Sequence, residues 1–153
     1  MILGIDISTK LIAIAGIEKE KYYVFLLPSL KESWLERYQD LFIQFSKFLK
    51  ENKKKIKKVY IEDPPFVQNH LTHSKLVKVS AICEIECFRN NIPVYGVHNK
   101  MWKHDLIKNG NSTKSQIKNF AEKLFGDNIK TLPQDAIDAL CIAKWGSIYS
   151  KIL

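Results

Sequence analysis

Met1-Ile2-Leu3-Gly4-Ile5-Asp6-Ile7-Ser8-Thr9-Lys10 is the stretch of sequence that decides the fold. A short, isoleucine-rich run bounded by a Ser-Thr-Lys cluster is typical of a buried central β-strand. The run contains one carboxylate, Asp6, and an unpaired charge is very costly to bury. We therefore expect this strand to lie inside a sheet and to end near Asp6, whose carboxylate faces a cation.

The segments that follow define the rest of the sheet. Residues 11–17 and 22–27 are two further β-type runs separated by short polar turns, which predicts an antiparallel meander. The expected elements that come next are a helix at 34–49, a strand at 59–62, a helix at about 72–89, a strand at 93–97, and helices at 100–108, 113–125 and 133–149. Because right-handed crossovers return the chain parallel, we expect a single α/β domain over residues 1–153. Its mixed five-stranded sheet has three antiparallel strands, then parallel strands, and is flanked by helices.

The composition indicates a globular protein with a basic surface. The chain is 46% hydrophobic and 26% charged, which is ordinary for a globular domain. It has no apolar run of about 18 residues and no signal peptide pattern, so we expect a cytoplasmic protein that does not enter a membrane. The net charge of +8 suits a polyanionic partner such as nucleic acid. Cys83, Cys87 and Cys141 form no CxxC pair, and we expect them to be reduced, buried thiols.

Four carboxylates are expected to meet at one edge of the sheet. Asp6 and Glu62 each lie near the carboxyl end of a parallel strand, where α/β sheets place their ligands. Asp135 and Asp138 are three residues apart, so both project from one side of the first turns of the last helix. Taken singly, each carboxylate is explained at least as well by a structural role as by a functional one. An aspartate at a strand end is often a turn residue, and Asp135 could simply complement the N-terminus of a helix.

Converging carboxylates repel one another unless cations neutralise them. Oxygen-only ligation favours Mg²⁺ or Mn²⁺ over zinc. Two such ions can activate a water molecule and stabilise the leaving oxygen of a phosphodiester. Ala136 and Ala139 are small enough to let the last helix approach the sheet closely.

Several segments carry a resemblance to a known family. Gly4-Ile5-Asp6, Tyr60-Ile61-Glu62 and the closing Asp135-Ala136-Ile137-Asp138-Ala139-Leu140-Cys141-Ile142-Ala143 resemble the RuvC-type Holliday-junction resolvases of the RNase H-like superfamily. Met101-Trp102-Lys103 and residues 110–117 are similar to that family's DNA-binding lysine segments. The resemblance covers nearly the whole chain, and its most specific part is the closing segment. The compact, Lys-, Ile- and Asn-rich chain suits a bacterial protein encoded by a phage or mobile element.

The resemblance implies a homodimeric endonuclease that uses Mg²⁺, with Mn²⁺ as a substitute and two ions in each active site. It would nick opposing strands of a four-way DNA junction symmetrically and leave 5′-phosphate ends. The implied metal-binding catalytic residues are Asp6, Glu62, Asp135 and Asp138. Lys103 and Lys114 would contact phosphates, and Phe66 would lie near the aromatic residue that contacts bases at the opened junction.

Four more residues are weighed for a role in DNA binding. Lys100, Lys108 and Lys118 either extend the phosphate-binding surface or belong to solvated helix faces. Trp102 either stacks on a base or packs in the core.

The helix expected at 72–89 is apolar on two sides. One side carries Leu76, Val79, Ser80, Cys83 and Cys87, and the other carries Val77, Ala81, Ile85 and Phe88. Such a helix is either sandwiched in the core or shared with a second subunit. The resemblance implies the second arrangement, with this helix as the dimer interface.

Three other functions stay open. An RNase H-like nuclease acting on flaps, forks or RNA hybrids needs the same acidic residues. A DNA-binding module that retains the fold needs none of them. Gly4-Ile5-Asp6-Ile7-Ser8-Thr9 also resembles the first phosphate-binding strand of sugar-kinase and actin-like ATPases. That fold requires two such domains and a second glycine-rich loop, which the six scattered glycines do not provide.

Overall fold

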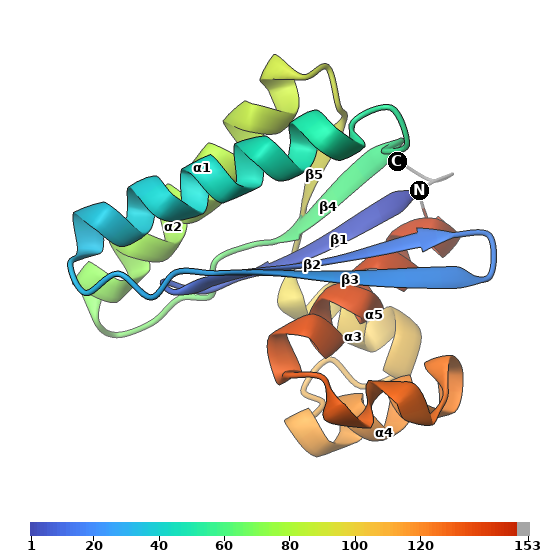
Figure 1. The fold of residues 1–153 in the computed structure, drawn as a ribbon. Helices are drawn as coiled ribbons and strands as arrows, with labels where there is room; N and C mark the ends of the chain where they lie inside the picture. Colours follow the sequence, from blue (N-terminus) through green and yellow to red (C-terminus); the bar gives the residue numbers. More distant parts are fainter. Residues whose placement is uncertain (150–153) are drawn as a thin grey trace.

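A five-stranded mixed sheet runs through the molecule, with helices on both of its faces (Figure 1). The structure is a computed structural model and describes residues 1–149. The strands are β1 (Ile2–Ile7), β2 (Leu11–Glu18), β3 (Lys21–Pro28), β4 (Lys58–Glu62) and β5 (Val94–Val97). The helices are α1 (Trp34–Asn52), α2 (His70–Arg89), α3 (Asn99–Ile107), α4 (Lys114–Phe125) and α5 (Gln134–Tyr149), with a 3₁₀ helix η1 (Asp127–Thr131).

The predicted sheet is confirmed. The strand order is β3-β2-β1-β4-β5, so the first strand lies at the centre. It pairs antiparallel with β2 and parallel with β4, and β4 pairs parallel with β5. Two local features differ from expectation. Helix α2 begins at His70 because the Asn69 side chain accepts hydrogen bonds from two of its first backbone N–H groups. The short helix η1 lies between the helices expected at 113–125 and 133–149, in a segment for which no element was expected.

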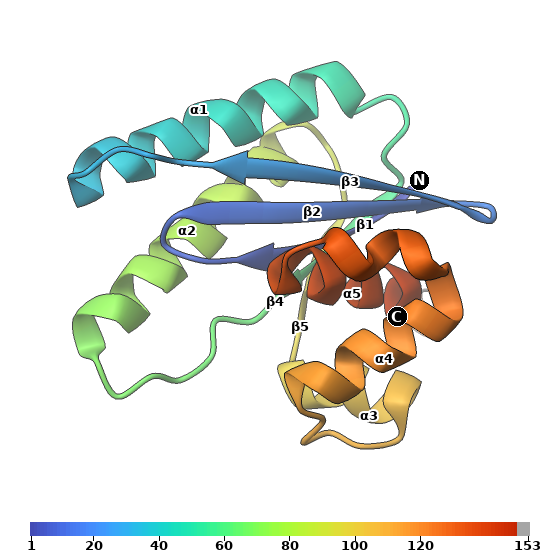
Figure 2. The same cartoon turned by 60° about the horizontal axis from the view of Figure 1, so that its bottom comes forward.

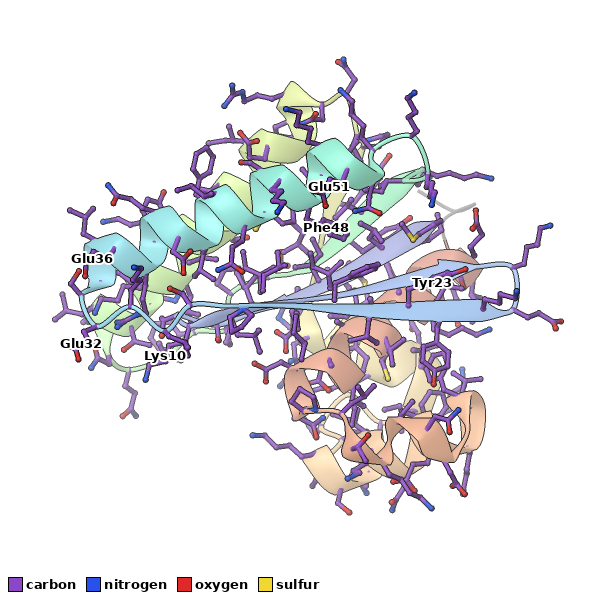
Figure 3. All side chains as sticks on the ribbon, viewed as in Figure 1. Lys10, Tyr23, Glu32, Glu36, Phe48 and Glu51 are labelled. Carbon is purple, nitrogen blue, oxygen red and sulfur yellow. The ribbon has the colours of Figure 1, made fainter. Side chains whose placement is uncertain are left out.

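The two faces of the sheet bury two separate sets of side chains. Helices α1 and α2 cover one face, and α3, α4 and α5 lie on the other (Figures 1 and 2). Side chains alternate along a strand, so Leu3, Ile5 and Ile7 of β1 join the core under α1 and α2. Figure 3 shows Phe48 between α1 and the sheet, where its ring lies 5.0 Å from that of Phe25. Asp6 therefore belongs to the opposite face, the one that α5 covers.

Helix α5 packs unusually close to β1. A Cβ atom on Gly4 would come far inside the van der Waals radii of the Ala139 carbonyl oxygen and the Ala143 nitrogen. Ala13 and Ala15 of β2 are fully buried on the same face. The predicted close approach of a helix lined with small residues is thus confirmed. Its consequence is that the first turns of α5 reach the carboxyl end of β1.

The cysteines are free and buried, as predicted. Burial raises the pKa of the Cys83 and Cys141 thiols well above the usual range and that of Cys87 to about 12. These thiols are therefore poor metal ligands and poor nucleophiles. Among the helices within residues 1–149, none combines the length and apolar character needed to cross a bilayer.

Candidate active site

Asp6 and Glu62 lie at the carboxyl ends of two adjacent parallel strands. The register pairs Ile5 of β1 with Ile61 of β4, so each carboxylate is the next residue on its own strand. Both point to the face covered by α5, because Tyr60, two residues before Glu62, packs there. Glu62 is buried, with 7% of its surface exposed, and Asp6 is partly exposed.

Helix α5 adds two carboxylates from its first turns. Asp135 lies in the first turn, and Asp138 accepts a hydrogen bond of 2.8 Å from Gln134 Nε2. Burial raises the pKa of Asp138 to about 6, and the negative charges of Glu62 and Asp135 act in the same direction. The hydrogen bond from Gln134 and the positive charge of Lys103 oppose this rise in pKa.

The four expected carboxylates share one electrostatic environment. Burial raises the pKa of Asp6 well above its usual value, and the charges of Glu62, Asp138 and Asp135 raise it further, in that order. A hydrogen bond with the Glu62 carboxyl group acts in the same direction. The structure therefore brings Asp6, Glu62, Asp135 and Asp138 together, and we call this set the acidic cluster.

The chemistry of the acidic cluster fits a hard divalent cation. Carboxylate oxygens are the donors that Mg²⁺ and Mn²⁺ prefer. Burial and the neighbouring carboxylates raise the pKa of Asp6 and of Asp138, and a bound cation would oppose both effects. Over residues 1–149, no group of three or more His, Cys, Asp or Glu side chains is already arranged as a metal site. The residues thus fit such ions in the type of donor atom that they offer.

Glu62 is also held by two donors from α3. Trp102 Nε1 donates a buried hydrogen bond of 3.0 Å to Glu62 Oε1, and Asn99 Nδ2 donates to the same oxygen. The register pairs Glu62 with Val97, and α3 starts two residues later. Asn99 and Trp102 are three residues apart on that helix, so both face Glu62. Because Trp102 is fully buried, stacking on a base is excluded and the expectation of core packing is confirmed.

Nothing in the sequence pattern singled out Asn99 or Gln134. Both follow directly from helix starts: Asn99 is the first residue of α3, and Gln134 is the first residue of α5. A polar residue at the start of a helix beside a strand-end carboxylate is the only signal that would have indicated them.

The lysines expected to bind DNA differ in whether their Nζ atoms donate to a backbone carbonyl oxygen. Lys103 lies near the acidic cluster, since its charge lowers the pKa of Asp138, and its Nζ is 5.3 Å from the centre of the Trp102 ring. Lys100 and Lys114 are exposed near the first turns of α3 and α4. Lys108 and Lys118 instead donate from Nζ to the carbonyl oxygens of residues 105 and 130, at 2.9 and 3.1 Å.

Phe66 lies in the loop that joins β4 to α2, four residues after Glu62. Its side chain is 80% exposed, and its ring centre lies 6.1 Å from that of His73. A single exposed hydrophobic residue is common on protein surfaces, so exposure alone assigns no role to this ring. The structure presents an apolar group on the loop that leaves the acidic cluster.

Helix α2 has the two predicted faces, and only one of them packs on the sheet. Its buried residues include Leu76, Val79, Cys83 and Cys87. Val77, Ile85 and Phe88 remain 44%, 53% and 63% exposed. The arrangement in which this helix is sandwiched in the core of one chain is therefore wrong.

The mixed five-stranded sheet, with three antiparallel strands followed by parallel strands and helices on both faces, has the RuvC/RNase H-like fold. No protein-family model matches the sequence, and no curated protein is significantly similar to it. Solved structures do match. Thermus thermophilus RuvC in complex with a Holliday junction substrate superposes with a TM-score of 0.80 and 18% identity, over 99% of this chain and 94% of that one.

Two further structures agree with this fold. Another Thermus thermophilus RuvC structure matches with a TM-score of 0.78 and 19% identity, over 99% of this chain and 95% of that one. The yeast mitochondrial Holliday junction resolvase Ydc2 matches with a TM-score of 0.62 and 16% identity, over 98% and 80% of the two chains. The resemblance inferred from the sequence is thus confirmed at the level of the fold.

Proposed function

We propose that this protein is a divalent-metal-dependent endonuclease that resolves four-way DNA junctions. The observation that carries the proposal is the acidic cluster, with raised pKa values on Asp6 and Asp138, at the carboxyl edge of a sheet with RuvC topology. Perturbed carboxylates gathered at one place are expected where a site is prepared for a charged ligand. Two of the structures that share this fold are described as a RuvC bound to a Holliday junction and a Holliday junction resolvase.

In this mechanism the acidic cluster would hold Mg²⁺ or Mn²⁺. Two such ions, when bound, would activate a water molecule and stabilise the leaving oxygen, so that the product carries a 5′-phosphate. The protein's own part is electrostatic. Asp6 and Asp138 must lose their protons before they act as ligands, and Lys103 favours the ionised form of Asp138. Glu62 is kept in place by its buried hydrogen bonds.

The DNA contacts would come from the lysines of α3 and α4 and from the loop after β4. Lys100, Lys103 and Lys114 would neutralise phosphates on either side of the cut bond, which is consistent with a net charge of +8. Phe66 would contact unstacked bases at the branch point, since its ring is exposed and apolar.

A homodimer would supply the two active sites that symmetric nicking requires. The exposed face of α2, with Val77, Ile85 and Phe88, is the surface that we propose for it. A Phe88→Glu variant should sediment as a monomer, while Ile43→Glu, an equally exposed substitution on α1, should behave like the wild type. Identical masses for the two variants would contradict this interface.

Junction cleavage is the direct test. A synthetic four-way junction labelled on each strand is incubated with the protein in Mg²⁺ or Mn²⁺, and the ends are mapped and sealed with ligase. The wild type should nick opposing strands, and Asp6→Asn should not. Asp127→Asn is the matched control, because Asp127 is exposed and forms an ion pair with Lys130 on the surface. An uncut junction in both metals would refute the proposal.

Competing substrates decide between the related activities. Flaps, forks and RNA–DNA hybrids are added as unlabelled competitors to the labelled junction. Strong inhibition of junction cutting by one of these, together with faster cutting of that substrate when it is labelled in turn, would transfer the proposal to it. Binding of the junction without any cleavage would indicate a DNA-binding module.

A further inference from the structure

Within the acidic cluster, Glu62 has a distinctive set of partners. Both Trp102 Nε1 and Asn99 Nδ2 donate to the same oxygen, Oε1. Asp138 has one such donor, Gln134. The two donors to Glu62 come from one face of α3, and neither of them occupies Oε2.

These hydrogen bonds hold the Glu62 carboxylate in place, and they also give the buried indole N–H group of Trp102 an acceptor. A buried tryptophan needs only one acceptor, and a neutral oxygen would suffice. Here the acceptor is a buried carboxylate, and a second N–H group is aimed at it. Hydrogen bonds to a charged oxygen are stronger than neutral ones. Two of them, both donated from α3 to the single oxygen Oε1, restrain the side-chain torsions of Glu62.

The surrounding packing keeps these donors in place. Trp102 has no exposed surface. Further along the same helix, Asp105 Oδ2 accepts a hydrogen bond of 2.7 Å from Trp145 Nε1 of α5. This hydrogen bond joins α3 to α5 and does not involve Glu62.

We propose that Asn99 and Trp102 are positioning residues that act through Glu62, holding Oε1 so that Oε2 is directed toward the ligand of the acidic cluster. This inference rests on the proposed function only in that the ligand is taken to be a divalent cation. Removing a group that hydrogen-bonds to a metal-coordinating side chain and orients it typically lowers metal affinity or activity by about 10–100-fold.

The test uses Trp102→Phe and Asn99→Ala, with Trp145→Phe as the matched control. Each tryptophan variant keeps an aromatic ring and loses one indole N–H that donates to a carboxylate. Binding of Mn²⁺ to the protein without DNA is followed by electron paramagnetic resonance. Thermal unfolding is measured in parallel, so that loss of folding is distinguished from loss of affinity.

A spectroscopic measurement reports on the contact itself. The indole ¹H–¹⁵N signal that disappears in Trp102→Phe is assigned to Trp102. This signal should move when Glu62 is replaced by Gln and when Mg²⁺ is added, because its acceptor changes in charge. The signal that disappears in Trp145→Phe should stay in place in both cases.

The inference predicts that Trp102→Phe and Asn99→Ala weaken Mn²⁺ binding by about 10-fold or more and raise the Mg²⁺ concentration needed for cleavage, while junction affinity in Ca²⁺ stays unchanged. Trp145→Phe should leave Mn²⁺ affinity within about threefold. Wild-type Mn²⁺ affinity in both folded variants would overturn the inference, whatever the protein does to DNA. If the wild type cuts no DNA and the variants still lose affinity, the proposed function fails and the positioning role stands.

Discussion

Replacing Asp138 by Asn should stabilise the metal-free protein above neutral pH. Asp138 has a pKa of about 6 in the folded chain, chiefly because it is buried, against an ordinary value of 3.8. The folded state therefore binds more protons than the unfolded state between these two values. The free energy of unfolding must fall as pH rises through this window, and the loss is complete above the folded pKa.

The size of the effect follows from the two pKa values. A difference of about two units corresponds to about 3 kcal/mol of destabilisation at pH 8, and to only about 0.6 kcal/mol near pH 4. Asparagine removes the charge and keeps an oxygen that can accept the hydrogen bond from Gln134. The Asp138→Asn variant should therefore be more stable than the wild type by about 2–3 kcal/mol at pH 8, and nearly equal to it at pH 4.

Urea unfolding in EDTA, followed by tryptophan fluorescence at one fixed protein concentration, measures this difference. Asp127→Asn serves as the control for charge, because it removes the same charge from an exposed ion pair with Lys130. Its effect should be small at both pH values. Added Mg²⁺ should reverse the order once it reaches about 1,000 times its Kd, since it then stabilises the wild type by about 4.1 kcal/mol.

One result would refute the reasoning. If Asp138→Asn gains no stability at pH 8, or gains the same amount at both pH values, then Asp138 does not share a desolvated site with Glu62 and Asp135. The acidic cluster would then be a set of independent surface carboxylates, and the case for a prepared cation site would fall with it.

Two further predictions concern the packing and the DNA surface. Gly4→Ala should cost about 3 kcal/mol or more in thermal unfolding, because the new Cβ meets the backbone of Ala139 and Ala143 and forces α5 away from β1. Lys103→Gln should move the acid limb of the cleavage pH profile upward, since its charge lowers the pKa of Asp138. It should also reduce the slope of log affinity against log salt by about 1.

The fold was predictable because its signals are local. The isoleucine-rich run at residues 2–7 and the strand at 59–62 each have apolar side chains on both faces, which is typical of strands covered from two sides. The rule that crossovers are right-handed then placed these two strands side by side. The positions of Asp6 and Glu62 followed from the strand ends, and those of Asp135 and Asp138 from helical spacing.

The supporting contacts were not predictable because they depend on register between distant segments. Asn99 reaches Glu62 only because Glu62 pairs with Val97 and α3 begins immediately afterwards. A shift of one residue in that pairing would turn every side chain of β5 to the other face. Lys118 donates to the carbonyl oxygen of residue 130 because η1 forms, and no periodic pattern marks a 3₁₀ helix of five residues.

The same packing that gathers the acids also explains why they would bind a cation strongly. Small residues on one face, with Gly4 and Ala139 at the closest contact, let α5 approach β1 closely and bring its carboxylates near Asp6. Desolvation and the mutual repulsion of the carboxylates raise the pKa of Asp6 and of Asp138. These raised pKa values destabilise the metal-free fold at neutral pH. A divalent cation neutralises the carboxylates only in the folded state. The destabilisation that their repulsion causes in the metal-free protein is therefore recovered as part of the binding free energy of the cation. Stability without metal and affinity for metal should therefore change in opposite directions when a carboxylate of the cluster is neutralised.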